Sequence, residues 1–127
     1  MRQLLEIFVL LFGLICVGIA LIHIAGGPSA IQGSMPVNAA MDSDDRFHAT
    51  IFLGFGGALI WCSRGLGERR AVFGWLLIVF FLGGVARIIS AAQVGMPNIF
   101  LQALWALELG LPPMLWWWHR SVYGRVN

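Results

Sequence analysis

Four long apolar stretches, separated by short polar segments, constrain the fold of this chain more than any other feature. They run approximately over residues 4–25, 46–63, 71–93 and 99–118, with a longer polar loop at 26–45 and a polar tail from residue 119 onward. About 20 apolar residues in a helix cross the hydrocarbon core of a bilayer, and a helix satisfies its own backbone hydrogen bonds in lipid. The pattern predicts one all-α domain over residues 1–127, a four-helix transmembrane bundle.

The amino-acid composition favours a chain that resides in a lipid bilayer. Hydrophobic residues make up 59% of the chain and charged residues only 11%, whereas soluble domains carry about 25% charged residues. All eight basic residues are arginine, and none belongs to a basic helix face interleaved with aromatic side chains. Such a face is typical of nucleic-acid-binding proteins, so we expect the lipid bilayer, and no nucleic acid, as the partner.

The distribution of arginine predicts how the four segments are oriented. Cytoplasmic loops of membrane proteins are rich in basic residues, and tryptophan gathers at the membrane–water interface. Four spans would leave Arg46 alone on one side of the membrane and bring together on the other side Arg2, Arg64, Arg69, Arg70, Arg120 and Arg125. The same ends carry Trp61, Trp75, Trp116, Trp117 and Trp118. We therefore expect a multi-pass protein with both termini and the 64–70 turn in the cytoplasm.

Two charged residues, Arg87 and Glu108, stand within the third and fourth apolar stretches. Charges at membrane depth are costly and usually face a partner or mark a functional site. The short turn between the two stretches makes them antiparallel neighbours. Counted from that turn, the two residues differ in depth by only about 6 Å, so an Arg87–Glu108 ion pair is expected. Whether this pair only fixes helix packing or also binds a ligand stays open at this point.

Other polar residues gather in the same half of the predicted membrane domain. Pro112 and Pro113 cannot donate to the carbonyls of Glu108 and Leu109, so a polar notch is expected beside Glu108. We predict an outward-opening pocket between the third and fourth helices, with ligand-binding residues Arg87, Glu108, Ser90, Arg46, Gln93 and Gln102. The cluster of acidic residues and serine at 42–45 is expected to cap the second helix.

The sequence carries no motif of a metal, cofactor or catalytic site. His23 and His48 would lie at similar depth, as two haem-ligating histidines do, but interfacial, hydrogen-bonded imidazoles explain them more simply. There is no nucleophile elbow, HExxH motif, CxxC pair or phosphate-binding glycine loop. We expect no cofactor and no metal, and we favour a non-catalytic role while enzymatic activity stays open.

Four sequence patterns resemble a known protein family. They are DxxxRF at 42–47, LGFG at 53–56, GGxxRxxSxxxxGxP at 83–97 and LELxxPPxLxxW at 107–118. The chain resembles domain-of-unknown-function family 4345, small bacterial membrane proteins with four helices. The resemblance covers nearly the whole chain and implies a location in the bacterial inner, or cytoplasmic, membrane, but no activity. The positions that match the family patterns are Arg46, Arg87, Ser90, Pro97, Glu108 and Pro112, and they do not include His23 or His48.

Three functional hypotheses follow from the sequence. The first is binding of a small amphiphile or a partner in the pocket beside Arg87, with Glu108 balancing the charge. The second is an accessory subunit or assembly factor of a membrane complex, or a homo-oligomer, docked through small residues on the helices. These small residues are Gly54, Gly56, Gly57, Gly83 and Gly84. The third is proton-coupled transport or membrane-enzyme chemistry that uses Glu108.

Overall fold

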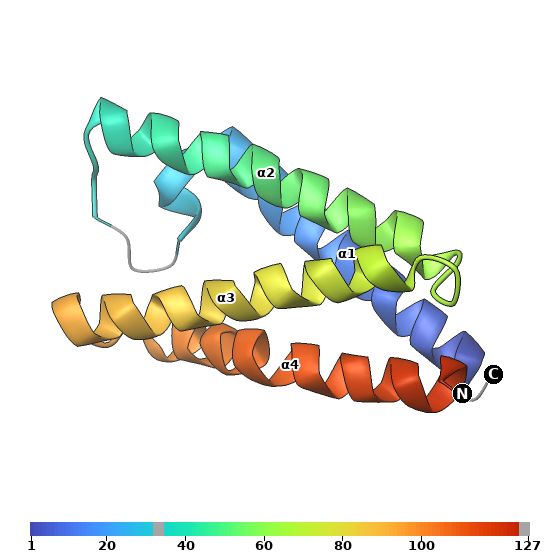
Figure 1. Cartoon of the computed structure of the whole chain (residues 1–127). Coiled ribbons are helices and arrows are strands. Elements are labelled where there is room, and N and C mark those ends of the chain that lie inside the picture. Colours follow the sequence, from blue (N-terminus) through green and yellow to red (C-terminus); the bar gives the residue numbers. More distant parts are fainter. Residues whose placement is uncertain (32–34, 125–127) are drawn as a thin grey trace. The chain divides into compact units, whose positions relative to one another are not determined.

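The computed structural model describes residues 1–31 and 35–124, and within them the chain is helical apart from short turns. The helices are α1 (Arg2–Gly26), the short 3-10 helix η1 (Gly27–Ala30), α2 (Ala39–Ser63), α3 (Arg70–Val94) and α4 (Ile99–Tyr123) (Figure 1). The all-α class with four long helices is thereby confirmed. The chain forms two compact units, one of residues Glu6–Gly65 and one of residues Met1–Leu5 with the chain from Leu66 onward.

Three of the helical segments are long and apolar enough to cross a membrane. They are Arg2–Ala30, Arg70–Val94 and Ile99–Tyr123. The acidic residues of α2 and Arg46 lie in its first two turns and lower its mean hydropathy. The second span, expected at 46–63, therefore stays a prediction, as does the placement of both termini in the cytoplasm.

In the unit of residues 6–65, α1 and α2 run antiparallel and approach closely at two glycines. A Cβ atom on Gly13 would lie 2.9 Å from the carbonyl oxygen of Gly56, and a Cβ on Gly56 would lie 2.9 Å from that of Gly13. Because both positions lack a side chain, the two backbones meet directly, as in small-residue crossings of membrane helices. A Cβ on Gly54 or Gly57 would have no atom of the described residues within 4 Å, so their faces of α2 stay open.

The start of α2 differs from the sequence prediction. The helix begins at Ala39, and Asn38 is its N-cap, with its side-chain oxygen accepting a hydrogen bond from the backbone N–H of Met41 at 2.9 Å. Asp42 lies in the first turn, where a negative charge interacts favourably with the helix dipole. The expectation that residues 42–45 cap this helix was wrong, because Asn38 supplies the acceptor one turn earlier.

In the other unit, α3 and α4 form an antiparallel hairpin, drawn in yellow and orange-red in Figure 1. Gly95 has a φ of 113°, which glycine adopts readily, and Asn98 caps α4 by accepting from the N–H of Leu101 at 2.9 Å. An asparagine directly before an apolar run is a common helix cap, so the sequence predicts this cap at Asn98 as well. Helix α4 continues through Pro112 and Pro113 and ends at Tyr123, beyond the predicted end at 118.

Candidate functional site

The predicted ion pair between α3 and α4 is present. The Nε atom of Arg87 donates a hydrogen bond to Oε2 of Glu108 over 2.6 Å. The pair forms because the turn at 95–98 is short, so that residues seven and nine positions from the two helix ends meet at similar depth. The structure therefore confirms the pairing on which the candidate site was built.

A glycine beside the pair brings the two helices together. A Cβ atom on Gly84 would lie 2.8 Å from Cδ2 of Leu109 and 3.2 Å from Cβ of Glu108. Gly84 is buried and lies about one turn before Arg87 on the same side of α3. The missing side chain at position 84 lets the backbone of α4 approach, and this places the carboxylate of Glu108 within reach of Arg87.

The two partners of the pair are exposed to different degrees. The Glu108 side chain is 14% exposed, whereas the Arg87 side chain is 41% exposed. Arg87 uses Nε for the ion pair, and no atom of residues 1–31 or 35–124 accepts a hydrogen bond from its two terminal nitrogens. A guanidinium carries five N–H donors, so the open side of Arg87 can bind an oxygen-rich group.

The remaining residues predicted on this hairpin do not join the pair. Ser90 and Gln93 are exposed, and within the described chain neither side chain forms a hydrogen bond. Gln102 donates from Nε2 to the carbonyl oxygen of Pro97 over 2.8 Å and so braces the turn into α4. A role of these three residues in ligand binding stays a prediction.

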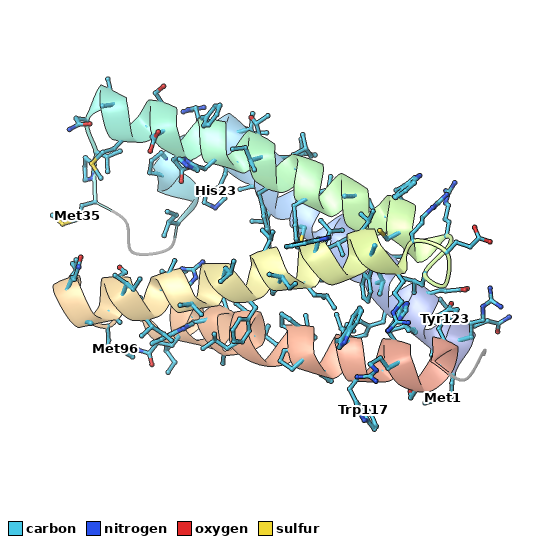
Figure 2. All side chains as sticks on the ribbon, in the orientation of Figure 1. Met1, His23, Met35, Met96, Trp117 and Tyr123 are labelled. Carbon is cyan, nitrogen blue, oxygen red and sulfur yellow. The ribbon has the colours of Figure 1, made fainter. Side chains whose placement is uncertain are left out.

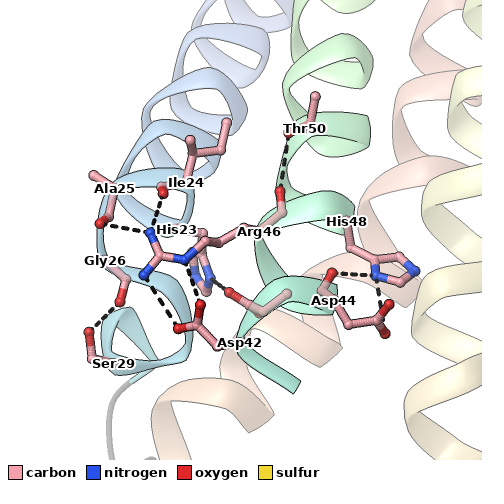
Figure 3. Close-up of polar contacts among 11 residues, drawn as sticks. His23, Ile24, Ala25, Gly26, Ser29, Asp42, Asp44, Arg46, His48 and Thr50 are labelled. Carbon is pink, nitrogen blue, oxygen red and sulfur yellow. Dashed lines mark hydrogen bonds and ion pairs between the residues drawn. The ribbon is translucent and has the colours of Figure 1, made fainter. Parts of the chain in front are cut away.

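Arg46 lies in the unit of residues 6–65, and its guanidinium forms hydrogen bonds within that unit (Figure 3). Its Nη1 donates to the carbonyl oxygens of Ile24 at 2.7 Å and Ala25 at 3.1 Å, and its Nε donates to Asp42 at 2.8 Å. The guanidinium therefore satisfies carbonyls at the end of α1, where the helix leaves its last acceptors unpaired. The hydrogen bond from Arg46, together with its charge, lowers the pKa of Asp42 below the ordinary value.

The two histidines of this unit each contact a neighbouring acidic residue. Nδ1 of His23 lies 3.1 Å from Oδ2 of Asp45, and Nδ1 of His48 lies 2.8 Å from the carbonyl oxygen of Asp44 (Figure 3). Across the described ranges, no three histidine, cysteine or acidic side chains gather in a metal-ligating group. These contacts fasten α1 to α2 and order the first turns of α2.

Sequence reasoning missed a buried histidine near the end of α4. The chain from residue 119 onward was expected to be a polar tail, but His119 is only 1% exposed and donates from Nε2 to the carbonyl oxygen of Leu66 over 2.7 Å. Its ring stacks on Trp116 at 5.6 Å and lies 4.8 Å from the ring of Tyr123. The spacing of positions 112, 115, 116, 119 and 123 is helical and would have extended the predicted helix to this point.

The fold and the ion pair define a class: small all-α proteins with membrane-length helices and a charge pair between two of them. The sequence matches the family described as Domain of unknown function (DUF4345) over residues 4–119. The chain belongs to this family, as its sequence patterns suggested. No curated protein and no solved structure matches the chain.

Proposed function

We propose that the protein is an integral membrane protein of the bacterial cytoplasmic membrane that binds the polar end of a small amphiphile at Arg87. The proposal rests on the two terminal nitrogens of Arg87, which donate to no atom of the described residues. Donors without acceptors are costly inside a bilayer, and a bound carboxylate or carbonyl oxygen would satisfy them. Glu108 already neutralises one positive charge, so a group with at most one negative charge fits the pair better than a dianion.

Fatty acids and fatty esters have the chemistry that this arrangement favours. The terminal nitrogens of arginine can bind a carboxylate in a bidentate manner, and an ester carbonyl offers one acceptor. An alkyl chain would then lie against the apolar surface of α3 and α4, where Ile88 is 45% exposed and Leu107 is 53% exposed. An alcohol of the same length lacks the carbonyl acceptor and serves as the matched control ligand.

Thermal stability of the purified protein in detergent tests the proposal. Oleate is expected to raise the melting temperature, methyl oleate to raise it less, and oleyl alcohol, which offers only a neutral hydroxyl acceptor, to raise it least. The double variant Arg87→Leu/Glu108→Leu removes both charges, because removal of one would leave a buried charge unpaired. This variant should lose the response to oleate, whereas Arg120→Gln, an exposed arginine elsewhere on α4, should keep it. An oleate response that survives in the double variant would refute binding at this pair.

The number of spans is a separate part of the proposal and has its own test. Seventeen residues separate Arg46 from Arg64, about 26 Å of helix, which is the lower limit for crossing a bilayer. Four spans place both termini on one side, whereas three spans place them on opposite sides. We expect green fluorescent protein to fluoresce when fused to either terminus in a bacterial cell, and alkaline phosphatase at either terminus to be inactive. Activity of the phosphatase at one terminus alone would show that α2 does not cross.

A second candidate function, an accessory subunit docked through small residues, rests on a different observation. Gly56 and Gly84 pack within their own units, but a Cβ atom on Gly54, Gly57 or Gly83 would have no atom of the described residues within 4 Å. Open glycines on membrane helices allow close approach of another helix. Mass analysis of the protein extracted in mild detergent should show a larger complex, and Gly54→Leu/Gly57→Leu should dissociate it. A monomer in the unchanged protein would count against this role.

A further inference from the structure

A groove lies at the opposite end of the α3–α4 hairpin from Arg87. Its volume is about 480 Å³, and its lining includes Glu68, Arg70, Gly74, Trp75, Ile78 and Trp116. This volume is within the range of small-ligand sites, about 300–1,000 Å³. The groove is shallow and widely open at the surface, and all of its lining residues belong to the unit that contains α3 and α4.

One end of the groove carries two opposite charges. The guanidinium of Arg70 lies 5.4 Å from the centre of the Trp116 ring, which positions this cation over an aromatic face. Glu68 is exposed, and it forms no hydrogen bond or ion pair with any residue that the structure describes. The lining of the groove therefore contains a cation and an anion two positions apart in the chain, each with hydrogen-bonding capacity for a ligand.

The other end of the groove is apolar. Trp75 is 67% exposed and Ile78 is 48% exposed, and both lie on α3 beyond the charged end. A Cβ atom on Gly74 would lie 3.2 Å from Cζ3 of Trp116, so the glycine lets the indole ring lie against α3. The next residue, Trp117, points away from the hairpin (Figure 2) and is not among the lining residues of the groove. An amphiphile with a zwitterionic head and an alkyl chain matches the order of charged and apolar groups along the groove.

We propose that this groove binds the head group of a phospholipid with a primary amine, such as phosphatidylethanolamine. Arg70 would bind the phosphate, and the carboxylate of Glu68 would accept hydrogen bonds from the ammonium group. The first turn of α3 lies at the groove, and its dipole adds a favourable field for the phosphate. Acyl chains would extend along Trp75 and Ile78. Tryptophan and arginine near one end of membrane helices are typical of the head-group region.

The charge pair selects among phospholipids. Phosphatidylglycerol has a phosphate but no cation, so Glu68 would repel it or stay unpaired. Phosphatidylcholine has a cation, but its quaternary ammonium cannot donate a hydrogen bond to the carboxylate. A primary ammonium carries a positive charge and also donates hydrogen bonds to the carboxylate. We expect phosphatidylethanolamine to bind about two- to fivefold more tightly than the other two lipids, the size of an exposed ion pair.

This inference rests on the membrane location proposed above but not on the amphiphile at Arg87. Arg70 and Arg87 are seventeen residues apart on α3, about 26 Å along the helix axis. One head group cannot contact both arginines. The two sites can therefore be tested separately in the same protein.

Native mass spectrometry of the full chain, supplied with equal amounts of the three phospholipids with identical acyl chains, tests the inference. The unchanged protein should retain phosphatidylethanolamine about two- to fivefold over the other two. Arg70→Gln should lower retention of all three lipids, and Glu68→Gln should abolish the preference for the amine. Glu68→Lys should shift the preference to phosphatidylglycerol, and Arg120→Gln should change nothing. Circular dichroism of each variant shows whether it is folded.

Three outcomes would overturn the inference. The first is equal retention of the three lipids by the unchanged protein. The second is a preference for the amine that persists in both Glu68 variants. The double variant Arg87→Leu/Glu108→Leu should keep the preference for phosphatidylethanolamine while it loses the oleate response. If it lost the lipid preference instead, the lipid would belong to the Arg87 site and the groove would carry no function of its own.

Discussion

Replacing Gly84 by alanine tests how the candidate site is assembled, and Gly83 provides a matched control. Both glycines lie side by side in α3, but only position 84 faces α4. A new Cβ at 84 would lie 3.0 Å from Cγ of Leu109 and 3.2 Å from Cβ of Glu108, whereas one at 83 would meet no atom of the described chain within 4 Å. The first of these atoms belongs to a side chain that can adjust, but Cβ of Glu108 moves only with the backbone of α4.

The expected magnitude follows from comparing the two variants. Each gains the helix-forming advantage of alanine over glycine, about 0.5–1 kcal/mol, so this gain cancels in the comparison. The steric cost at position 84 remains, and overpacking of one carbon into a close contact costs about 1–3 kcal/mol. Gly84→Ala should therefore be about 1–3 kcal/mol less stable than Gly83→Ala, and Gly83→Ala should equal or exceed the unchanged protein.

Reversible unfolding in mixed detergent micelles measures this difference. The protein is titrated with sodium dodecyl sulfate in a mild non-ionic detergent, and the loss of helix is followed by far-UV circular dichroism. The Arg87–Glu108 pair should weaken in Gly84→Ala, because the same movement of α4 carries Glu108 away from α3, and the oleate response should fall with it. Equal stability of the two variants would refute the reasoning, since the close approach at 84 would then play no part in assembling the hairpin.

Three further predictions concern other contacts. Arg46 lowers the pKa of Asp42. The contribution of Asp42 to stability is therefore fully present above the ordinary aspartate pKa and is lost as the pH falls through the lowered value. Thermal melts from about pH 6 down to about pH 2 should show a loss of stability toward acid pH that is smaller in Asp42→Asn. His119→Phe keeps an aromatic ring in the stack but leaves the buried carbonyl of Leu66 without its donor, and it should lower the unfolding free energy by about 1–3 kcal/mol; unchanged stability would mean that packing alone holds this turn. Gly56→Ala should destabilise the protein by about 1–3 kcal/mol through overlap with α1, and a melting temperature at or above that of the unchanged protein would contradict the direct backbone contact.

The sequence predicted the Arg87–Glu108 pair because three simple conditions coincided. Each residue is the one charged group within its predicted apolar stretch, the connecting turn is short, and helical rise fixes the depth of both. Under these conditions the rise per residue alone predicts that the side chains of Arg87 and Glu108 lie at similar depth and can reach each other. The same reasoning placed Asn98 at the start of α4, since asparagine before an apolar run is a common cap.

Rotational positions around a helix were harder to predict. The sequence does not distinguish Gly84, which contacts α4, from Gly83, which is open, because adjacent residues differ by about 100° around the axis and both helices are apolar on most faces. In a soluble helix a polar face would identify the buried side. In an apolar helix this signal is absent, so the packed face becomes known only from the partner helix.

The turn at 64–70 illustrates a second limit of sequence reasoning. From the sequence, its arginines and the tryptophans near it predict only the orientation of the helices, and His119 belongs to an expected polar tail. In the structure this end of the hairpin contains a buried imidazole bound to Leu66 and a groove with Glu68 and Arg70. The features that orient a membrane helix are cations and indole rings, which are also groups that bind lipid head groups.

An exchange that preserves the charge distinguishes the two roles. Arg70→Lys keeps the orientation signal but loses the planar guanidinium over Trp116. The terminal fusions report the topology of this variant, and native mass spectrometry reports its lipid retention. If Arg70→Lys keeps the topology and loses lipid retention, the guanidinium has a binding role beyond orientation; if it keeps both, the positive charge at position 70 is sufficient, because lysine also binds phosphate, and the binding role is then tested by Arg70→Gln.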